Sequence, residues 1–414
     1  MKDTIKTPRF LEEAARRYRL TFQEFRQVRA MARDLEQWGE EPLDRLWRQA
    51  EQEIPHGDLP VRKKRILRRL GERHASLQGE AKRYGAPKSF APKRPPLTFQ
   101  TEVSDKKIFG RCPAFSEKTV CCNLHTIDAV ENCGFGCSYC TIQTFYGKPV
   151  TFDARLGEKL KKIELDPGRF YHIGTGQSSD SLMWGNRGGM LDDLCAFAGD
   201  HPNVLLELKT KSPRVDYFLE RDVPPNVVLS WSLNTPAIIK NEEHFTASLE
   251  ERLKAARKAA DRGIPVAFHF HPMVYYEGWK EEYTGVAGKV LENFAPGEVR
   301  FISLGTVTFI KPVLQAIRRG GLPTKMLQMP FQKDPLGKWT YPDRLKEEMF
   351  KTLYQALAPW HGKVFIYLCM EKPEIWKKVF GFAYPSHREF ENAFALLNPF
   401  GLTSPGECHR QGRL

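Results

Sequence analysis

The sequence predicts an α/β fold: a partial (β/α)6 barrel with a basic helical region before it and a C-terminal α/β extension after it. Three observations predict this fold. Short apolar segments alternate with amphipathic segments from residue 125 onward, which is typical of parallel strands and crossover helices. The barrel-like part holds six such units, fewer than the eight of a closed barrel. Residues 9–80 instead carry helical periodicity throughout.

The helical region begins with "RFLEEAARRYRL" and "FQEFRQVRAMARDLEQW", in which apolar residues recur three and four positions apart. In "PVRKKRILRRLGERHASL", Ile66, Leu67 and Leu70 form one apolar stripe. The residues around that stripe are basic: Arg62, Lys63, Arg65, Arg68, Arg69 and Arg73. Such a helix either binds phosphate groups or simply presents a solvated face.

Charge is concentrated in the same part of the chain. The whole sequence has a formal net charge of +13 and an isoelectric point near 9.2. Residues 1–95 contain about 23 Lys and Arg against about 14 Asp and Glu, which is roughly +9 of that total. A localised basic surface favours a polyanionic partner, most simply nucleic acid, although a generally basic enzyme is the alternative.

The stretch "YGAPKSFAPKRPPLTF" contains four prolines and three basic residues, and it predicts an extended linker. We therefore divide the chain into a basic helical region (1–95), a linker and cysteine-containing lead-in (96–124), the barrel (125–330) and the extension (331–414). No apolar run reaches about 18 residues, so we expect no membrane-spanning helix. The segment "MKDTIKTPRF" has no apolar core of a signal peptide, and we expect a cytoplasmic protein.

Six segments are predicted strands of the barrel: 125–130, 169–174, 203–208, 226–231, 265–270 and 299–304. Helical segments such as "MLDDLCAFAGDH" and "SLEERLKAARKAADRG" lie between them, and the second ends at Gly263, a favoured C-terminal cap. In the extension we expect a helix within 341–360 and a strand at 363–369.

Three cysteines follow the first predicted strand in "ENCGFGCSYCTIQTFYG" with C-x3-C-x2-C spacing: Cys133, Cys137 and Cys140. The loops after the strands of parallel barrels form active sites. Structural zinc would need a fourth ligand from a second pair, and no C-x2-C or H-x3-H pair appears downstream. A [4Fe–4S] cluster held by three thiolates leaves one iron open for a substrate or cofactor. Buried or zinc-bound thiols are the alternative.

The motif and its position resemble the radical S-adenosylmethionine (SAM) superfamily. That resemblance implies that the open iron binds the amino and carboxylate groups of SAM. One electron from the cluster then cleaves SAM and yields a 5′-deoxyadenosyl radical, which abstracts a hydrogen atom from substrate. The cofactors carry this chemistry, and the protein orients them and excludes water.

Within that superfamily, the chain from about Ile127 to about Tyr283 resembles the spore photoproduct lyase family, whose enzymes repair a thymine dimer in DNA. "CSYC" matches the family's cluster loop, including Tyr139 before the third cysteine, which the resemblance makes a catalytic candidate. "GTGQSSDSL", "LLELKTKS" and "LSWSLN" are similar to the family's SAM-contacting segments. The resemblance thereby implies four SAM contacts: Ser179, Asp180, Lys209 and Ser232.

Two positions depart from the family pattern. Gln177 stands where the family has a cysteine that returns a hydrogen atom to the product radical, and an amide does not donate one readily. Thr141 stands where the family has a tyrosine of the radical relay. Cys369, at the end of the strand predicted at 363–369, is the substitute donor that we expect.

The remaining motifs admit more than one interpretation. Cys112, Cys121 and Cys122 lie before the first strand and either pack near the active site or hold an auxiliary metal. His269 and His271 share one face of a strand and are expected to line a substrate pocket, with metal binding as the alternative.

The sequence thus predicts a radical SAM enzyme with a [4Fe–4S] cluster and SAM, acting on nucleic acid, most simply on a DNA photoproduct turned out of the duplex. An electron donor such as ferredoxin or flavodoxin is an expected partner. Two alternatives remain at this stage. One keeps the radical chemistry and changes the substrate to RNA, a peptide or a small molecule. The other is a nucleic-acid-binding protein with a structural or redox-sensing cluster.

Overall fold

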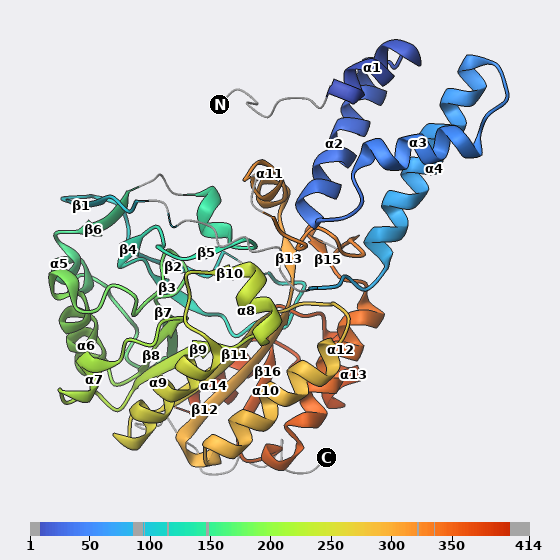
Figure 1. Ribbon diagram of the computed structural model, residues 1–414. Helices are drawn as coiled ribbons and strands as arrows, with labels where there is room; N and C mark the ends of the chain where they lie inside the picture. The colour runs from blue at the N-terminus through green and yellow to red at the C-terminus, as the bar shows by residue number, and fades with distance from the viewer. Residues whose placement is uncertain are drawn as a thin grey trace.

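The computed structural model describes residues 9–85, 94, 96–113, 116–145, 149–320, 323–334 and 336–397. Part of the predicted linker, the end of the predicted extension and Cys408 lie outside these residues. Two bodies are visible: an α/β body built around a curled sheet, and a group of helices at the N-terminal end that projects away from it (Figure 1).

The central sheet has eight strands in the order β16-β12-β11-β9-β8-β7-β3-β2. All neighbouring strands in it are parallel except β2 and β3, which are antiparallel. Their bounds are β2 (Phe109–Arg111), β3 (His125–Ile127), β7 (Tyr171–Gly174), β8 (Val204–Thr210), β9 (Val227–Ser232), β11 (Val266–Met273), β12 (Val299–Thr306) and β16 (Phe365–Leu368). The six predicted barrel strands are thus present and parallel.

The seventh parallel strand, β16, comes from the segment that we predicted to be an extension. It pairs with β12 through Phe301↔Phe365 to Leu304↔Leu368, so it continues the barrel sheet. The division into four domains stays a prediction, but the structure joins residues 365–368 to the barrel.

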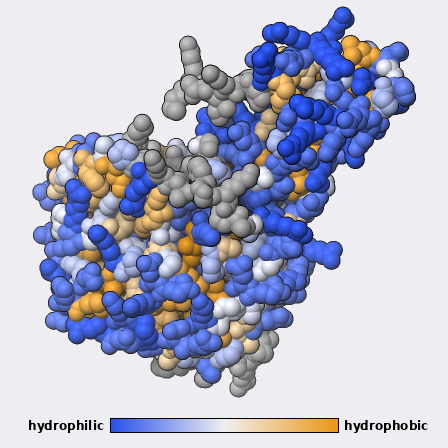
Figure 2. Space-filling model, in the orientation of Figure 1, coloured by the Kyte–Doolittle hydropathy of each residue, from blue (hydrophilic) through white to orange (hydrophobic). Residues whose placement is uncertain are grey.

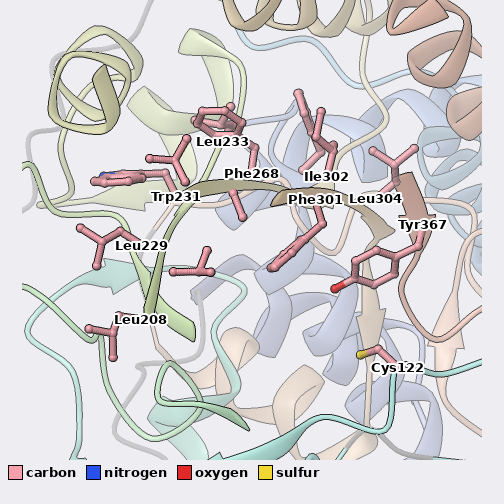
Figure 3. Packing of buried hydrophobic residues seen from close by; sticks show 14 of the residues in the cluster. Cys122, Leu208, Leu229, Trp231, Leu233, Phe268, Phe301, Ile302, Leu304 and Tyr367 are labelled. Atoms are coloured by element: carbon pink, nitrogen blue, oxygen red, sulfur yellow. The ribbon is translucent and has the colours of Figure 1, made fainter. Parts of the chain in front are cut away.

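The strands are apolar because helices and loops cover both of their faces. Every residue of β9 is buried, and the core near it includes Leu208, Trp231, Phe268 and Phe301 (Figure 3). The principal helices packed around the sheet are α6 (Met190–Asp200), α9 (Leu249–Asp261), α10 (Trp279–Asn293) and α12 (Asp343–Ala356). Ser248 and Glu251 cap the start of α9 reciprocally, and Gly263 after its end has the left-handed φ of +74°.

Shorter elements surround the mouth and the rim of the sheet. The short strands are β1 (Phe99–Glu102), β4 (Val130–Glu131), β5 (Gly136–Cys137), β6 (Val150–Asp153), β10 (Glu243–His244), β13 (Thr308–Phe309), β14 (Gln332–Lys333) and β15 (Trp339–Thr340). The remaining helices are α5 (Leu156–Leu160), α7 (Asp216–Leu219), α8 (Pro236–Glu242), α11 (Lys311–Arg319), α13 (Pro373–Phe380) and α14 (His387–Ala395). Among the described residues, no helix combines the length and apolarity needed to cross a bilayer.

Four helices form the N-terminal group, here called the helical unit: α1 (Arg9–Arg17), α2 (Phe22–Trp38), α3 (Leu43–Glu53) and α4 (Leu59–Gly79). Leu35, Trp38, Trp47 and Ile66 belong to a hydrophobic core of its own, separate from that of the barrel. The unit contacts the barrel through α2 and α11, where Arg318 Nε donates to Asp34 Oδ1 over 2.9 Å.

Four basic residues of helix α4 form ion pairs with glutamates. Lys63 pairs with Glu24 at 3.0 Å, and Arg69 pairs with Glu53 at 3.0 Å. Arg68 and Arg73 also meet glutamates, and Arg62 donates to two backbone carbonyls. The face of the helical unit seen in Figure 2 is mostly hydrophilic, but five of the six basic residues singled out in α4 already have partners. This favours the solvated interpretation of that helix.

Candidate functional site

A cavity of about 270 Å³ lies at the carboxyl ends of the parallel strands. All nine site residues predicted from the sequence line it: Cys133, Cys137, Tyr139, Cys140, Ser179, Asp180, Lys209, Ser232 and Cys369. They come from the loop after β3, the loop after β7 and the ends of β8, β9 and β16. Parallel strands bring these distant segments together because their carboxyl ends share one edge of the sheet.

Residues 133–140, here called the cluster loop, carry the three thiols of the C-x3-C-x2-C motif. The short strand β5 of this loop pairs with β10, in the register Cys137↔Glu243 and Gly136↔His244. The amide of Cys140 donates to the carbonyl of Cys137 over 3.1 Å. The three cysteines of this loop line one cavity, an arrangement suited to three ligands of a compact cluster.

The glycines of the cluster loop lie in close packing. A Cβ on Gly134 would lie 2.6 Å from Met183 Cε and 2.8 Å from Trp184 Cη2. A Cβ on Gly136 would approach the ring of Phe245 to 3.0 Å. Neither glycine has a left-handed φ. We expected these glycines to let the backbone turn tightly. The structure instead indicates that glycine is suited to these positions because a side chain would meet neighbouring residues.

The loop after β7 is organised by Asp180. Its carboxylate accepts from the amides of Leu182, Met183 and Lys211, and from Thr210 Oγ1 over 2.7 Å. The neighbouring Ser179 donates to the carbonyl of Asn132, next to the cluster loop, over 2.6 Å. Both residues therefore join the β7 loop to its surroundings, and their contact with a cofactor remains a prediction.

Two lysines on and just after β8 line the cavity: Lys209, which the sequence singled out, and Lys211, which it did not. Burial lowers the pKa of Lys209, whereas the pKa of Lys211 is raised because neighbouring Glu243 and Cys137 outweigh its burial. Among the described residues, neither ammonium has a hydrogen-bond acceptor within range. Two such cations beside three thiols fit a cluster with an anionic ligand, such as the carboxylate of an amino acid.

The charged groups around the two lysines show that Lys211 lies nearer to the cluster loop than Lys209 does. Lys211 interacts with Cys137 and Cys140, and its Nζ is 5.9 Å from the centre of the Tyr139 ring. Lys209 instead interacts with Cys369 and Glu207. The motif "LKTKS" contains both lysines, and sequence reasoning selected only the first.

Tyr139 is fixed by a buried ion pair that the sequence did not reveal. Its hydroxyl donates to Glu243 Oε1, and Arg252 Nη2 donates to Glu243 Oε2 over 2.6 Å. Arg252 is 0% exposed and also donates to the carbonyl of Ser232 over 2.7 Å. Burial, followed by the charge of Glu243, raises the pKa of Tyr139 well above its usual value. Tyr139 is therefore a neutral phenol held beside the cluster loop.

The two histidines of β11 have different surroundings. His271 lines the cavity, with its Nε2 2.9 Å from Ser303 Oγ. His269 lies deeper and contacts the carboxylate of Glu207, which is also 2.8 Å from His172 Nε2. Burial lowers the pKa of His269 to about 4, so its ring is neutral at pH 7. The expectation that both line a pocket holds for His271 only.

Cys369 lies at the cavity wall with three further cysteines nearby. The segment containing Cys121 and Cys122 runs beside the end of β16, where the amide of Val120 donates to the carbonyl of Glu371 over 2.8 Å. Burial raises the pKa of Cys369, and the neighbouring Cys121 and Cys112 raise it further. The described residues contain no group of three or more His, Cys, Asp or Glu arranged to hold a single metal ion. Packing near the active site and an auxiliary metal both stay predictions for these cysteines.

Gln177 and Thr141, the two departures from the family pattern, line the same cavity. Neither side chain has a thiol or a phenol. Among the residues that line the cavity, Cys369 has a thiol and Tyr139 has a phenol.

A family profile and the similar curated proteins agree on one family. The family profile described as "Spore photoproduct lyase" matches residues 124–359. The chain is 27% identical over 186 residues to spore photoproduct lyase of Clostridium acetobutylicum, covering 43% of this chain and 54% of that one. It is 28% identical over 211 residues to the enzyme of Bacillus subtilis, covering 49% and 61%. The chain thus spans little more than half the length of these curated relatives.

A solved structure has the same fold. It is a variant of spore photoproduct lyase with bound AdoMet and dinucleoside spore photoproduct, and it superposes with a TM-score of 0.56 at 21% identity. The match covers 66% of this chain and 82% of that one. The helical unit lies outside the residues that the family profile matches.

Proposed function

Because the chain belongs to the spore photoproduct lyase family, we propose that it is a radical SAM enzyme that repairs a thymine photoproduct in DNA. The observation that carries the proposal is the cavity at the barrel mouth. Three cysteines from one loop and two half-buried lysines, whose ammonium groups have no hydrogen-bond acceptor among the described residues, line it together.

Cys133, Cys137 and Cys140 would hold a [4Fe–4S] cluster through three of its irons. Together with SAM, this cluster would supply a 5′-deoxyadenosyl radical for hydrogen abstraction. Lys209 and Lys211 would neutralise the SAM carboxylate, and Ser232 and the Ser179–Asp180 segment line the same cavity. A solved relative is described with bound AdoMet, which supports this cofactor.

DNA is the proposed substrate, since relatives of this family are spore photoproduct lyases and one is described with a dinucleoside spore photoproduct. The cavity is too small for a duplex, so the damaged nucleotides would have to turn out of the helix. Phosphate contacts would position the strand. A low-potential donor such as ferredoxin or flavodoxin would reduce the cluster, and reduced thiols suit a cytoplasmic location.

Hydrogen return is the step in which this chain departs from its family. An S–H bond is weak enough to give a hydrogen atom to a carbon radical, and Gln177 has none. Cys369 lines the same cavity with a pKa raised by burial, so it carries its proton at pH 7. We assign hydrogen return to Cys369: its S–H bond would break as the product C–H bond forms, and one electron from the donor and one proton would restore the thiol. Tyr139 brings a phenol to the wall of the same cavity.

The test is turnover of dinucleoside spore photoproduct by anaerobically reconstituted protein with dithionite and SAM. Release of two thymidines, absent in Cys140→Ala, supports repair. Formation of 5′-deoxyadenosine without any release of thymidine, on the dinucleoside and on irradiated duplex DNA, would instead overturn the substrate assignment and leave the radical chemistry standing.

A further inference from the structure

Glu242 is a buried carboxylate that lies next to the cluster loop without lining the cavity. It is the last residue of α8, is 0% exposed, and precedes Glu243, the residue that pairs with Cys137. The amide of Ser138 donates to the carbonyl of Glu242 over 2.8 Å. The backbone of Glu242 is therefore bonded to the middle of the cluster loop, and so is its side chain, through the Ser138 hydroxyl.

The carboxylate of Glu242 accepts hydrogen bonds from three separate segments. The Ser138 hydroxyl donates to Oε2, and Thr324 Oγ1 donates to the same oxygen over 2.6 Å. Tyr84 OH and the amide of Lys325 donate to Oε1 over 2.8 and 2.9 Å. Four donors satisfy the buried carboxylate of Glu242. Because all four bind the same carboxylate, a shift of one donor changes the hydrogen-bond geometry of the others.

Two of these three segments are connected to the helical unit. The segment with Tyr84 follows it in the chain, and the segment with Thr324 and Lys325 is hydrogen-bonded to it. Tyr84 comes five residues after the end of α4. The amide of Thr324 donates to the carbonyl of Gln37 in α2 over 2.9 Å. Lys325 Nζ donates to Glu40 Oε1, just beyond α2, over 2.9 Å. The third segment is the cluster loop itself, through Ser138 between Cys137 and Tyr139.

We propose that Glu242 is a positioning residue that couples the docking of the helical unit to the conformation of the cluster loop. This inference rests on the proposed function for the role of the loop. The helical unit, which lies outside the family match, then acts as an outer support of the cluster site. Loss of its contacts loosens the segment from Gly136 to Ile142 before it affects the barrel.

Tyr84→Phe and Glu242→Gln test the coupling by hydrogen–deuterium exchange on the apoprotein. Tyr84→Phe removes one donor, and hydrogen bonds to charged groups are worth about tenfold or more in an opening equilibrium. We expect amides 136–142 to exchange about tenfold faster in Tyr84→Phe and faster still in Glu242→Gln. Tyr18→Phe is the matched control, because Tyr18 OH donates to Glu51 over 2.6 Å within the helical unit, remote from the loop.

A second readout uses the reconstituted protein. A repositioned loop changes the g-values of the reduced cluster in electron paramagnetic resonance, whereas a general loss of stability does not. We expect this change in Glu242→Gln and not in Tyr18→Phe. Equal exchange of amides 136–142 in Tyr84→Phe and Tyr18→Phe would overturn the coupling. If the wild-type protein binds no cluster but Tyr84→Phe still accelerates exchange, the proposed function fails and the coupling stands.

Discussion

Replacement of the two cavity lysines by methionine is expected to weaken SAM binding. Met keeps the length and most of the apolar contacts of the lysine stem but removes the charge. In the described residues neither ammonium has an acceptor, so the substitution breaks no internal hydrogen bond. A lost internal hydrogen bond therefore does not account for a weaker affinity for SAM. A hydrogen bond to a charged group contributes roughly 1.5–3 kcal/mol, which is about ten- to 150-fold in the dissociation constant.

The assay is anaerobic equilibrium dialysis of SAM against reconstituted Lys209→Met and Lys211→Met. Lys211 lies nearer the cluster thiols, so we expect the larger loss in Lys211→Met. Lys289→Met is the control, since Lys289 pairs with Glu250 on the surface. Wild-type affinity in both cavity variants would refute the assignment of these lysines to SAM.

Three further outcomes are expected. Cys369→Ala should still form 5′-deoxyadenosine but should yield altered products in place of thymidine, measured by mass spectrometry; unchanged products would exclude Cys369 as hydrogen donor. Glu243→Gln should lower the free energy of unfolding in urea by about 3–5 kcal/mol, because it leaves the buried Arg252 without its carboxylate. A loss below about 1 kcal/mol would contradict that. Burial lowers the pKa of Lys82 to about 7, so the unfolded chain binds more protons above that pH and stability should rise from pH 7 toward pH 10. Lys82→Met should flatten this rise, and an unchanged slope would show that Lys82 is not its source.

The sequence predicted those parts of the structure that depend on local pattern. The six barrel strands are recognisable because strands covered on both faces form short apolar runs, as in β9. The three cysteines were recognised in the sequence because they lie close together in one loop with a characteristic spacing. Ser179, Lys209 and Ser232 were found at or just after strand ends, and parallel strands bring all such ends to one edge.

The contacts that were missed join residues far apart in the chain. Tyr139 and Glu243 are 104 residues apart, and Thr324 and Glu242 are 82 apart. Neither glutamate belongs to a motif, so only the folded chain reveals their roles. The position of β16 in the sheet was missed for a similar reason, because a long segment with its own helices separates it from β12. The ion pairs of α4 likewise depend on helices α2 and α3, which a single helical pattern does not reveal.

Formation of 5′-deoxyadenosine tests the central claim most directly. The protein is reconstituted anaerobically with iron and sulfide, reduced with dithionite and incubated with SAM, and the nucleoside is measured by chromatography and mass spectrometry. We predict 5′-deoxyadenosine from the wild-type protein and none from Cys133→Ala. A wild-type protein that holds a reducible [4Fe–4S] cluster, binds SAM and still forms no 5′-deoxyadenosine would contradict the account.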